Sequence, residues 1–583
     1  MIGADEFSFT YPTTDERALS GVSFEVNEGE VLGVVGPVEA GKTTLAMALA
    51  SFAPQNTGGT TRGELTVAGR DPRDATDNAV AMVFEDYTAQ LTQVRVIDEV
   101  IAPLINRGVP RAEATERARE LLEDVRLADV EGKFTWELSG GQQQRLAIAA
   151  ALAIDPEVLI FDTATDMLDP AGKDAVTNLV SSLSGGTTLV VTENDPDALV
   201  GIADRVLVLD GGERVAFGPA DDLLRDADLL ERVGVAPPVC ARIADGLGLP
   251  GAPLTPGEFL DALDAGVGAE GAGRGVVGSD AGAADGGRVS TARGFGETLL
   301  RAENVRYEYG SDEVAVAGID FGVREGEVHA VIGGNGAGKT TFVKLLCGLF
   351  EPTRGTVYVD GEPTGGRPAR EVAETVGIAL QDPDEQLSEQ TVAAELRFPL
   401  EKRRYERSGP LGLSKRERYD GSFIDARIEA VRDLIGLSGD IMDEDPVFLP
   451  RGERRRVTIA SALAPEPDVL VLDEPAAGLD ATARDRVGRA IERLRDDGKG
   501  IVLVDHDMDF VCEVADTITV LEDGSVAMQG PVSEVFAPDN WEWLETRHMR
   551  PPRAARLARQ VGVDALTAGE FVETFAPILE VSG

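Results

Sequence analysis

One stretch of the sequence combines glycines with a Lys-Thr pair in a spacing that suits phosphate binding. Residues 333–340 read Gly-Gly-Asn-Gly-Ala-Gly-Lys-Thr, after an apolar run and before a helical pattern. Backbone N–H groups of such a loop surround phosphate oxygens, the Lys reaches the phosphate chain, and the Thr hydroxyl binds Mg²⁺. We therefore predict that a nucleotide is bound by Gly333, Asn335, Gly336, Gly338, Lys339, Thr340 and Thr341.

A second stretch supplies the acidic groups that such a site needs. The apolar run 469–472 predicts a buried strand, and Asp473 and Glu474 follow it directly. Asp473 is a candidate metal ligand and Glu474 a candidate general base. With both stretches present, a chance glycine-rich turn is no longer a competing explanation.

These elements recur, because the chain is a tandem duplication. Residues 30–36 (Glu-Val-Leu-Gly-Val-Val-Gly) resemble residues 327–333, and residues 254–259 resemble 566–571. Lys42 matches Lys339 at an offset of 297, and Asp162 matches Asp473 at an offset of 311. The predicted domains are 1–235, a small module at 236–264, a linker at 265–297, a second domain at 298–535 and a second small module at 536–583.

The patterns between these motifs predict the fold class. Short Val/Ile/Leu runs alternate with helical patterns in each half, which indicates an α/β fold with parallel-sheet cores. The linker is rich in Gly and Ala, and a coil of that length spans roughly 30 Å.

The composition is very acidic. The chain of 583 residues has a formal net charge of −47, with 102 Asp and Glu against 55 Lys and Arg. A cation-binding or nucleic-acid-mimicking surface is one reading. We favour a solvated surface adapted to high salt, because the acids are spread through periodic segments and 1 M salt screens charges within roughly 3 Å. Free nucleic acid is not expected as a partner.

Other sequence features restrict the class of protein further. Cys240, Cys347 and Cys512 are far apart, so neither a disulfide framework nor a metal cluster is predicted. The first residues have no signal-peptide pattern, and no apolar run reaches the roughly 18 residues of a spanning helix. We expect a soluble intracellular chain that docks on a membrane protein.

The order of the motifs resembles that of the ATPase subunits of ABC transporters. That order is the phosphate loop, a loop with Gln381, a Leu-Ser-Gly-Gly-Gln signature at 138–142, Asp473-Glu474 and His506. The resemblance implies two ABC-type P-loop NTPase domains, each with a parallel-sheet core, an antiparallel β subdomain and a helical subdomain. Residues 381–387 and 391–392 are also similar to the ATPases of energy-coupling-factor importers, which take up vitamins or transition-metal ions.

The resemblance assigns roles in the second copy, with ATP and Mg²⁺ as cofactors. Tyr309 would stack on adenine, and Gln381 would contact Mg²⁺ beside Thr340 and Asp473 and sense the γ-phosphate. Glu474 would activate water, His506 would hold the γ-phosphate, and Lys339 would complete the catalytic set. Asp480 would belong to a loop that crosses between the halves.

The first copy departs from the pattern. Glu39 stands where the other copy has Gly336, Glu85 replaces the loop Gln, Thr163 replaces the general base, and Glu193 replaces the His. Loss of a general base lowers a rate by about 10²- to 10⁴-fold. Hydrolysis at this loop is therefore not expected. Nucleotide binding is still expected through Tyr11, Gly36, Gly41, Lys42, Thr43 and Thr44, with Thr43 and Asp162 as metal ligands.

The second copy departs in its signature, which reads Leu-Pro-Arg-Gly-Glu at 449–453. Pro450 offers neither an N–H nor a hydroxyl. Paired domains of this family lie head to tail, each ATP between one P-loop and the partner's signature. The intact parts then share one site, in which Lys339 faces Ser139, Gly140, Gly141 and Gln142, and the altered parts share the other. The competing explanation is scattered drift in both copies, which would not sort the losses in this way.

An insertion at 401–422 in the second copy is basic. A docking patch and a solvated helix face are equally good explanations. Its basic residues are Lys402, Arg403, Arg404, Arg407, Lys415, Arg416 and Arg418.

Three functions are compatible with these features. The favoured one is the peripheral ATPase of an importer at the cytoplasmic face of the membrane, with integral membrane subunits and a substrate-binding membrane component as partners. The alternative is a soluble tandem ATPase that acts on ribosomes or nucleic acid. A non-hydrolytic scaffold is the third, and the intact Glu474–His506 pair argues against it.

Overall fold

The computed structural model describes residues 1–12, 14–74, 79–138, 140–163, 186–266, 294–310, 313–403, 405–408, 414–417, 419–547 and 549–582. Its contacts divide the chain into two compact units. The first comprises Met1–Val276 with Ala568–Gly583, and the second comprises Val277–Thr567. Most of the linker predicted at 265–297 lies outside the described residues.

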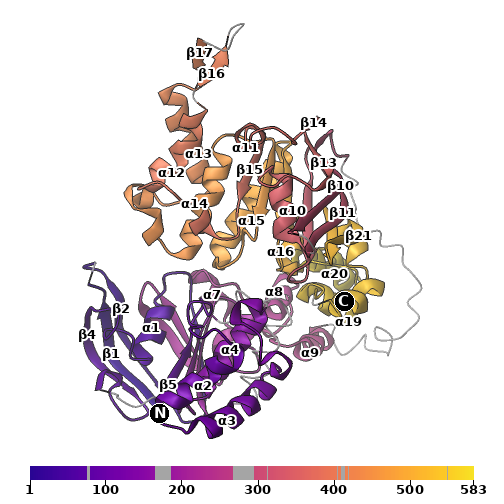
Figure 1. Ribbon diagram of the computed structural model, residues 1–583. Helices are drawn as coiled ribbons and strands as arrows, with labels where there is room; N and C mark the ends of the chain where they lie inside the picture. Colours follow the sequence, from indigo (N-terminus) through magenta and orange to yellow (C-terminus); the bar gives the residue numbers. More distant parts are fainter. Residues whose placement is uncertain are drawn as a thin grey trace. The chain divides into compact units, whose positions relative to one another are not determined.

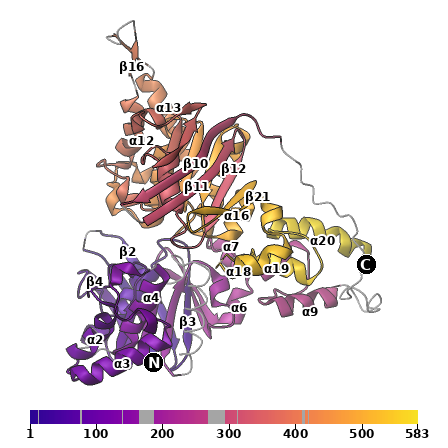
Figure 2. The ribbon, with the colours of Figure 1, turned by 45° about the vertical axis from the view of Figure 1, so that its right-hand side comes forward.

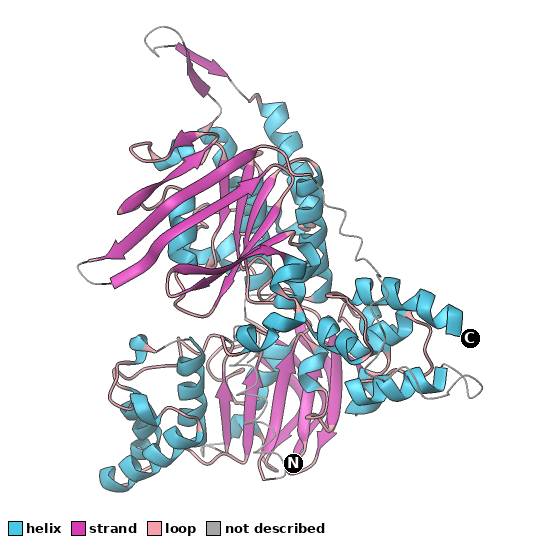
Figure 3. Cartoon of the chain, turned by 90° about the vertical axis from the view of Figure 1, so that its right-hand side faces the viewer, coloured by secondary structure: helices cyan, strands magenta, loops and turns pink. Residues whose placement is uncertain are grey.

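The core of the first unit is a six-stranded sheet in the order β5-β6-β7-β3-β8-β9. Figure 3 draws the strands in magenta. Every neighbouring pair is parallel except β8 and β9. All five residues of β3 are buried, which is typical of a parallel strand covered on both faces. The strands are β3 (Val31–Val35), β5 (Val80–Val83), β6 (Val158–Asp162), β7 (Thr188–Glu193), β8 (Arg205–Asp210) and β9 (Glu213–Pro219).

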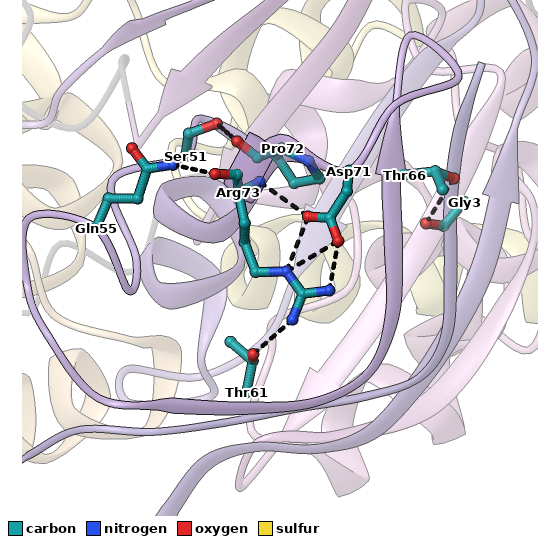
Figure 4. A network of polar contacts seen from close by, with 8 residues as sticks. All are labelled: Gly3, Ser51, Gln55, Thr61, Thr66, Asp71, Pro72 and Arg73. Carbon is teal, nitrogen blue, oxygen red and sulfur yellow. Dashed lines mark hydrogen bonds and ion pairs between the residues drawn. The ribbon is translucent and has the colours of Figure 1, made fainter. Parts of the chain in front are cut away.

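An antiparallel sheet, in the order β2-β1-β4, forms a second layer in this unit. Its strands are β1 (Ile2–Thr10), β2 (Arg17–Val26) and β4 (Thr60–Val67). Figure 4 shows how polar contacts hold the chain that follows β4. Arg73 binds the Asp71 carboxylate and donates to the Thr61 hydroxyl, while Ser51 and Gln55 donate to backbone carbonyls of Pro72 and Arg73. The loop after β4 is thereby bound to Ser51 and Gln55, which come shortly after residues 42–49, the helix that follows the first phosphate loop.

The helices of the first unit fall into three groups. Among its described residues, one helix follows the phosphate loop, three form a subdomain, and the others follow β9 at 220–266 or form the segment 568–582. The subdomain helices α2, α3 and α4 pack on one another, as Figure 1 shows. The helices are α1 (Lys42–Leu49), α2 (Val96–Asn106), α3 (Arg111–Asp124), α4 (Gly140–Leu152), α6 (Ala220–Leu224), α7 (Ala227–Arg232), α8 (Val239–Gly246), α9 (Pro256–Gly266) and α20 (Ala568–Ser582).

The second unit repeats this plan. Its core sheet has the order β15-β18-β19-β12-β20-β21, again with only the last pair antiparallel. An antiparallel sheet, β11-β10-β13-β14, accompanies it; β10, β11 and β12 are seen in Figure 2. The strands are β10 (Thr298–Tyr309), β11 (Glu313–Arg324), β12 (Val328–Gly333), β13 (Arg354–Val359), β14 (Glu362–Pro363), β15 (Val376–Ala379), β18 (Val469–Asp473), β19 (Gly500–Val504), β20 (Thr517–Glu522) and β21 (Ser525–Pro531).

The helical subdomain of the second unit contains α12, α13 and α14, which contact one another. The helices are α10 (Lys339–Leu346), α11 (Ala369–Val372), α12 (Val392–Lys402), α13 (Gly421–Ile435), α14 (Arg451–Leu463), α15 (Ala481–Asp496), α16 (Met508–Val514), α17 (Val532–Val535), α18 (Trp541–Glu545) and α19 (Arg553–Gln560). The predicted α/β fold, with a sheet core, an antiparallel subdomain and a helical subdomain in each half, is confirmed.

The basic insertion at 401–422 runs from the end of α12 to the start of α13 and contains a hairpin of β16 (Tyr405–Ser408) and β17 (Ser414–Glu417). Figures 1 and 2 show it extending away from α12 and α13. Lys402 is an exposed residue at the end of α12, so the helix-face explanation holds there. It is wrong for Arg407, Lys415 and Arg416, because their backbone pairs as antiparallel strands. Arg404 and Arg418 lie outside the described residues.

The last helix, α20, belongs to the first unit, where it packs on α8. The rings of Phe259 and Phe571 meet edge to face with centroids 5.7 Å apart. These two residues occupy equivalent places in the repeated tails. A Cβ added to Gly246 would lie 2.8 Å from Val572 Cγ2, so glycine is what permits the close approach of α8 and α20. The domain boundaries given above stay predictions.

Within the described part of the chain, each helix is too short or too polar to cross a bilayer.

Candidate active site

The phosphate loop of the second unit links β12 to α10. Gly338 has φ 94°, in the left-handed region that favours glycine, and it precedes the first residue of α10. Added Cβ atoms would lie 2.4 Å from the Leu521 carbonyl oxygen at Gly333 and 2.3 Å from that of Ala315 at Gly338. Both positions therefore require glycine, and the loop curls tightly around the start of the helix.

Lys339 is held across this loop. Its Nζ donates to the carbonyl oxygens of Gly333 at 2.7 Å and Gly334 at 3.1 Å. The predicted ligands Asn335, Gly336 and Thr340 are exposed beside it. The ammonium group therefore lies within the loop that is predicted to surround phosphate.

Tyr309 lies beside the start of α10. Its hydroxyl is 3.2 Å from Thr341 Oγ1, and its ring packs edge to face on Tyr307. The side chain remains 41% exposed. An aromatic surface is thus available next to the loop, and its stacking on adenine stays a prediction.

Three neighbouring parallel strands bring the catalytic candidates together. β15, β18 and β19 end just before Gln381, Glu474 and His506, and the carboxyl ends of parallel strands lie at one edge of the sheet. Gln381 Nε2 donates to Glu474 Oε2 at 3.0 Å, and His506 Nδ1 lies 3.4 Å from Glu474 Oε1. The carboxylate of Glu474 is therefore oriented from both sides.

Burial and neighbouring charges shift the pKa values of the adjacent carboxylates Asp473 and Glu474 in opposite directions. Burial alone would raise the pKa of Glu474, but the hydrogen bond and charge of His506, with Arg455 and Lys339, lower it to about 2. Burial and the charge of Glu474 raise the pKa of Asp473 to about 7. Glu474 is thus ionised at neutral pH and available to accept a proton.

Asp473 fits the role of a metal ligand. Its side chain is buried, and its Oδ2 has no hydrogen-bond partner among the described residues. A buried carboxylate oxygen without a donor is costly unless a cation neutralises it. The oxygen donors Thr340 and Gln381 suit Mg²⁺ in the same way.

The loop of the first unit has the same geometry. Gly41 has φ 93° before α1, and Lys42 Nζ donates to the carbonyls of Gly36 and Pro37, each at 2.7 Å. Thr43 Oγ1 donates to Asp162 Oδ1 at 3.2 Å, and the Tyr11 hydroxyl is 3.1 Å from Thr44 Oγ1. The lysine and tyrosine groups are therefore arranged alike in both units, whereas the bond between Thr43 and Asp162 has no counterpart among the described contacts of Thr340 and Asp473.

Glu39 takes the conformation of the glycine that it replaces. Its φ is 68°, and that of Gly336 is 80°. The loop thus keeps its path although a non-glycine residue in this region is strained. The side chain of Glu39 is exposed.

The general-base position of the first unit is conserved in backbone but not in chemistry. Thr163 has φ 47°, and Glu474, at the equivalent position, has φ 53°. Thr163 N donates to the Thr192 carbonyl at 3.1 Å, as Glu474 N donates to the Val504 carbonyl at 2.7 Å. A threonine hydroxyl cannot serve as the base that a carboxylate provides.

The sheet register corrects one sequence match. Asp162 pairs with Thr192, and Asp473 pairs with Val504. Two residues further along the chain, Asn194 therefore corresponds to His506, and Glu193 does not. The prediction that Glu193 replaces the His is therefore wrong by one residue, because the register of paired strands is set by backbone hydrogen bonds. By the same register, Glu85 in the first unit is equivalent to Gln381 in the second, as predicted.

The two signature stretches begin equivalent helices, α4 and α14. Gly140, Gly141 and Gln142 form the first turn of α4, and Ser139 lies outside the described residues. A Cβ on Gly141 would meet nothing within 4 Å. Pro450 precedes α14 and provides no side-chain cap. Gly140–Gln142 belong to the first unit and Lys339 to the second, so their predicted pairing stays a prediction.

One site residue was missed from the sequence. Arg455, on α14, is 1% exposed and donates to the backbone carbonyls of Leu380, Gln381 and Asp473. The sequence feature that could have revealed Arg455 is its charge at a position on the apolar side of a predicted helix.

Known proteins resemble this chain over most of its length. A family model described as "ABC transporter" matches residues 19–166 and 316–477. A protein of Caldanaerobacter subterraneus subsp. tengcongensis, named as an ABC transporter ATP-binding protein, is 32% identical over 97% of both chains. A Bacillus subtilis protein, named as an HMP/thiamine import ATP-binding protein, is 27% identical over 92% of this chain and 93% of its own length.

A solved structure also matches. It is cbiO1 from Clostridium perfringens, described as part of the ABC transporter complex cbiONQ. It is 29% identical, with a TM-score of 0.37, and the match covers 45% of this chain and 99% of that one.

Proposed function

Because this chain belongs to the ABC transporter family, we propose that it powers import across a membrane by hydrolysing ATP at one of its two phosphate loops. ABC domains bind and hydrolyse ATP, so the chain is an ATPase. The proposal adds that the loop at Lys339 carries the turnover and that the loop at Lys42 retains nucleotide without hydrolysing it.

The observation that carries the proposal is the placement of Glu474 between Gln381 and His506. An ionised carboxylate held at two points can take a proton from an attacking water as the water approaches the γ-phosphate. Lys339 stabilises negative charge on the phosphate chain, and His506 contacts the γ-phosphate. Mg²⁺, when bound by Thr340, Gln381 and Asp473, would neutralise further charge on the phosphates.

We propose that the active state pairs the two halves head to tail. Gly140, Gly141 and Gln142, with Ser139 before them, would then complete the ATP site at Lys339. Pro450 and Arg451 would face the site at Lys42. The sorting of intact and altered motifs into two sites supports this arrangement, because independent loss would scatter them.

A single-turnover assay on Glu474→Gln tests the proposal. The variant keeps the shape of the side chain but cannot accept a proton, so hydrolysis should fall by about 10²- to 10⁴-fold while ATP binding persists. The matched control is Thr163→Val at the equivalent position of the first unit, which should hydrolyse ATP at nearly the wild-type rate. Undiminished hydrolysis by Glu474→Gln would refute the assignment.

We propose further that the importer is of the energy-coupling-factor type, with the chain bound to the cytoplasmic face of the membrane. The similarity of residues 381–387 and 391–392 to that class supports this, as does the name of the B. subtilis relative. The substrate would then be a vitamin or a transition-metal ion. The acidic composition supports a high-salt environment for this assembly.

Exposed apolar side chains provide a surface for membrane subunits. Val447 and Phe448, in the turn η7 (Pro446–Phe448) before α14, are 56% and 84% exposed. Trp136, equivalent to Val447, is 64% exposed and stacks on Phe134. Adjacent apolar side chains with such exposure are typical of interaction surfaces.

Affinity purification of the full chain from its native cells tests the partner. Recovery of a membrane subunit with several spanning helices supports the importer. Recovery of ribosomes without a membrane protein would instead favour the soluble alternative.

A further inference from the structure

Arg455 is a buried charge directly behind the catalytic groups. Its side chain contacts backbone rather than solvent, since Nη1 donates to the carbonyls of Leu380 at 2.9 Å and Asp473 at 3.0 Å. Nη2 donates to the carbonyl of Gln381. One guanidinium group therefore joins the segments that follow β15 and end β18.

These carbonyls belong to catalytic residues or to their neighbours in the chain. Gln381 is itself one of the residues bound, and Glu474 is the residue after Asp473. A planar guanidinium with donors in a fixed geometry holds the separation between its acceptors more strictly than a flexible ammonium does. Arg455 thus ties the Gln381 loop to the end of β18 just beyond the last paired residues, Ala379 and Leu472.

The charge of Arg455 is compensated locally. Burial lowers its pKa, as does Arg451, whereas the carboxylates of Glu474, Asp473 and Asp505 raise it. A buried charge is stable only when such partners surround it. Arg455 therefore opposes the mutual repulsion of the acidic groups at the site.

The first unit provides a natural comparison. The residue equivalent to Arg455 is Gln144, at the same offset of 311 that relates Asp162 to Asp473, and it is equally buried. Beside Arg455, Arg454 pairs with Asp384 of the Gln381 loop, whereas its equivalent Gln143 donates to the Thr135 carbonyl at 3.0 Å. The unit that has Glu474 as general base thus has arginines at these two positions, and the unit that has Thr163 has glutamines.

We propose that Arg455 is a positioning residue that couples helix α14 to the Gln381 loop and to the Asp473–Glu474 strand end. A displacement of α14 would then move Gln381 relative to Glu474 and regulate hydrolysis at this site. This inference rests on the proposed function of the Lys339 site.

Steady-state kinetics of Arg455→Gln, which introduces the first-unit residue, test the coupling. The kcat for ATP should fall about 10-fold or more while KM changes by less than about 3-fold, because positioning of the reacting groups is lost and nucleotide binding is not. Arg455→Lys should give an intermediate kcat, since a lysine keeps the charge but not the planar geometry.

The control is Arg456→Gln on the same helix. Arg456 donates to the Gly436 carbonyl at 2.9 Å and pairs with Glu453, and none of its described contacts is with the Gln381 loop. Its kcat should stay at the wild-type value even if the melting temperature falls. An equal kcat loss in both variants would mean general destabilisation of α14 and would overturn the proposal.

Two further measurements separate this inference from the proposed function. In a double-mutant cycle, Arg455→Gln and Gln381→Ala should be non-additive in kcat, because both act through one loop; additivity would overturn the coupling. Hydrogen exchange of residues 380–387 should be faster in Arg455→Gln than in Arg456→Gln. Exchange does not depend on hydrolysis, so an unchanged rate refutes the coupling even if the wild type has no turnover at this site.

Discussion

At the scale of single residues, the buried polar groups away from the site are also constrained, and His329 is the clearest case. It is 1% exposed within β12, with Nδ1 2.9 Å from the Gly322 carbonyl and Nε2 2.8 Å from Thr519 Oγ1. Burial lowers its pKa to about 4, although the neighbouring Glu327 opposes the shift. His329 therefore folds in its neutral form.

This predicts a specific loss of stability in acid. In the unfolded chain His329 takes up a proton near its ordinary pKa of about 6.5, so its contribution is complete above that pH and declines as pH falls towards 4. Between pH 7 and pH 5 the free energy of unfolding should fall by up to about 2 kcal/mol from this group. Urea titrations at the two pH values measure it.

The variant His329→Gln isolates this effect. Glutamine keeps a hydrogen-bonding side chain but does not titrate, so the difference between the variant and the wild type should be larger at pH 7 than at pH 5. An identical pH dependence in both proteins would contradict the neutral buried histidine. Other groups, such as Asp505 with its raised pKa, contribute equally to both and cancel.

At the scale of elements, helices α4 and α14 have equivalent places in the two units but different first turns. Gly141 of α4 faces open space, so an added side chain causes no clash within the described residues. If α4 completes the ATP site at Lys339, Gly141→Asp should reduce turnover by more than about 10-fold, because a carboxylate would oppose the phosphates. Its unfolding should be unchanged, and both are measured on the full chain.

The matched change on the other helix is Arg451→Asp at the start of α14. It alters charge mainly at the site at Lys42, where no hydrolysis is expected, and acts on Arg455 only from the same helix, so turnover should fall much less than in Gly141→Asp. Equal losses in the two variants would refute the asymmetric arrangement of one hydrolytic and one degenerate site.

At the scale of the whole molecule, the C-terminal tails of the two repeats contact each other through α20. Phe571 is fully buried against Phe259, and α20 packs on α8 at Gly246. Removing a buried aromatic ring leaves a cavity, so Phe571→Ala should destabilise the first unit by about 3 kcal/mol or more. Calorimetry or urea unfolding of the full chain measures this effect.

Ile578→Ala, on the same helix, is the control. Its side chain is 48% exposed, and its truncation should change stability by less than about 0.5 kcal/mol. If Phe571→Ala were as stable as this control, the packing of α20 on the first unit would not matter for stability.

The sequence alone determined which residues can do the chemistry. Lys339, Asp473, Glu474 and His506 were found because phosphate and metal chemistry demand particular side chains at short, fixed spacings. The alternation of apolar strands and helices determined the α/β fold for a similar reason, since both depend on local patterns. The asymmetry between the copies also followed from residue types, as Thr163 and Pro450 lack the groups that the chemistry needs.

Only the tertiary structure decided which distant groups meet. The assignment of Asn194 rather than Glu193 came from the register of paired strands, and the role of Arg455 came from backbone carbonyls that carry no sequence signature. The association of α20 with the first unit joins residues that are more than 300 positions apart. Such contacts depend on long-range packing and backbone hydrogen bonding, which any apolar or charged residue of suitable size could satisfy, so no local pattern predicts them.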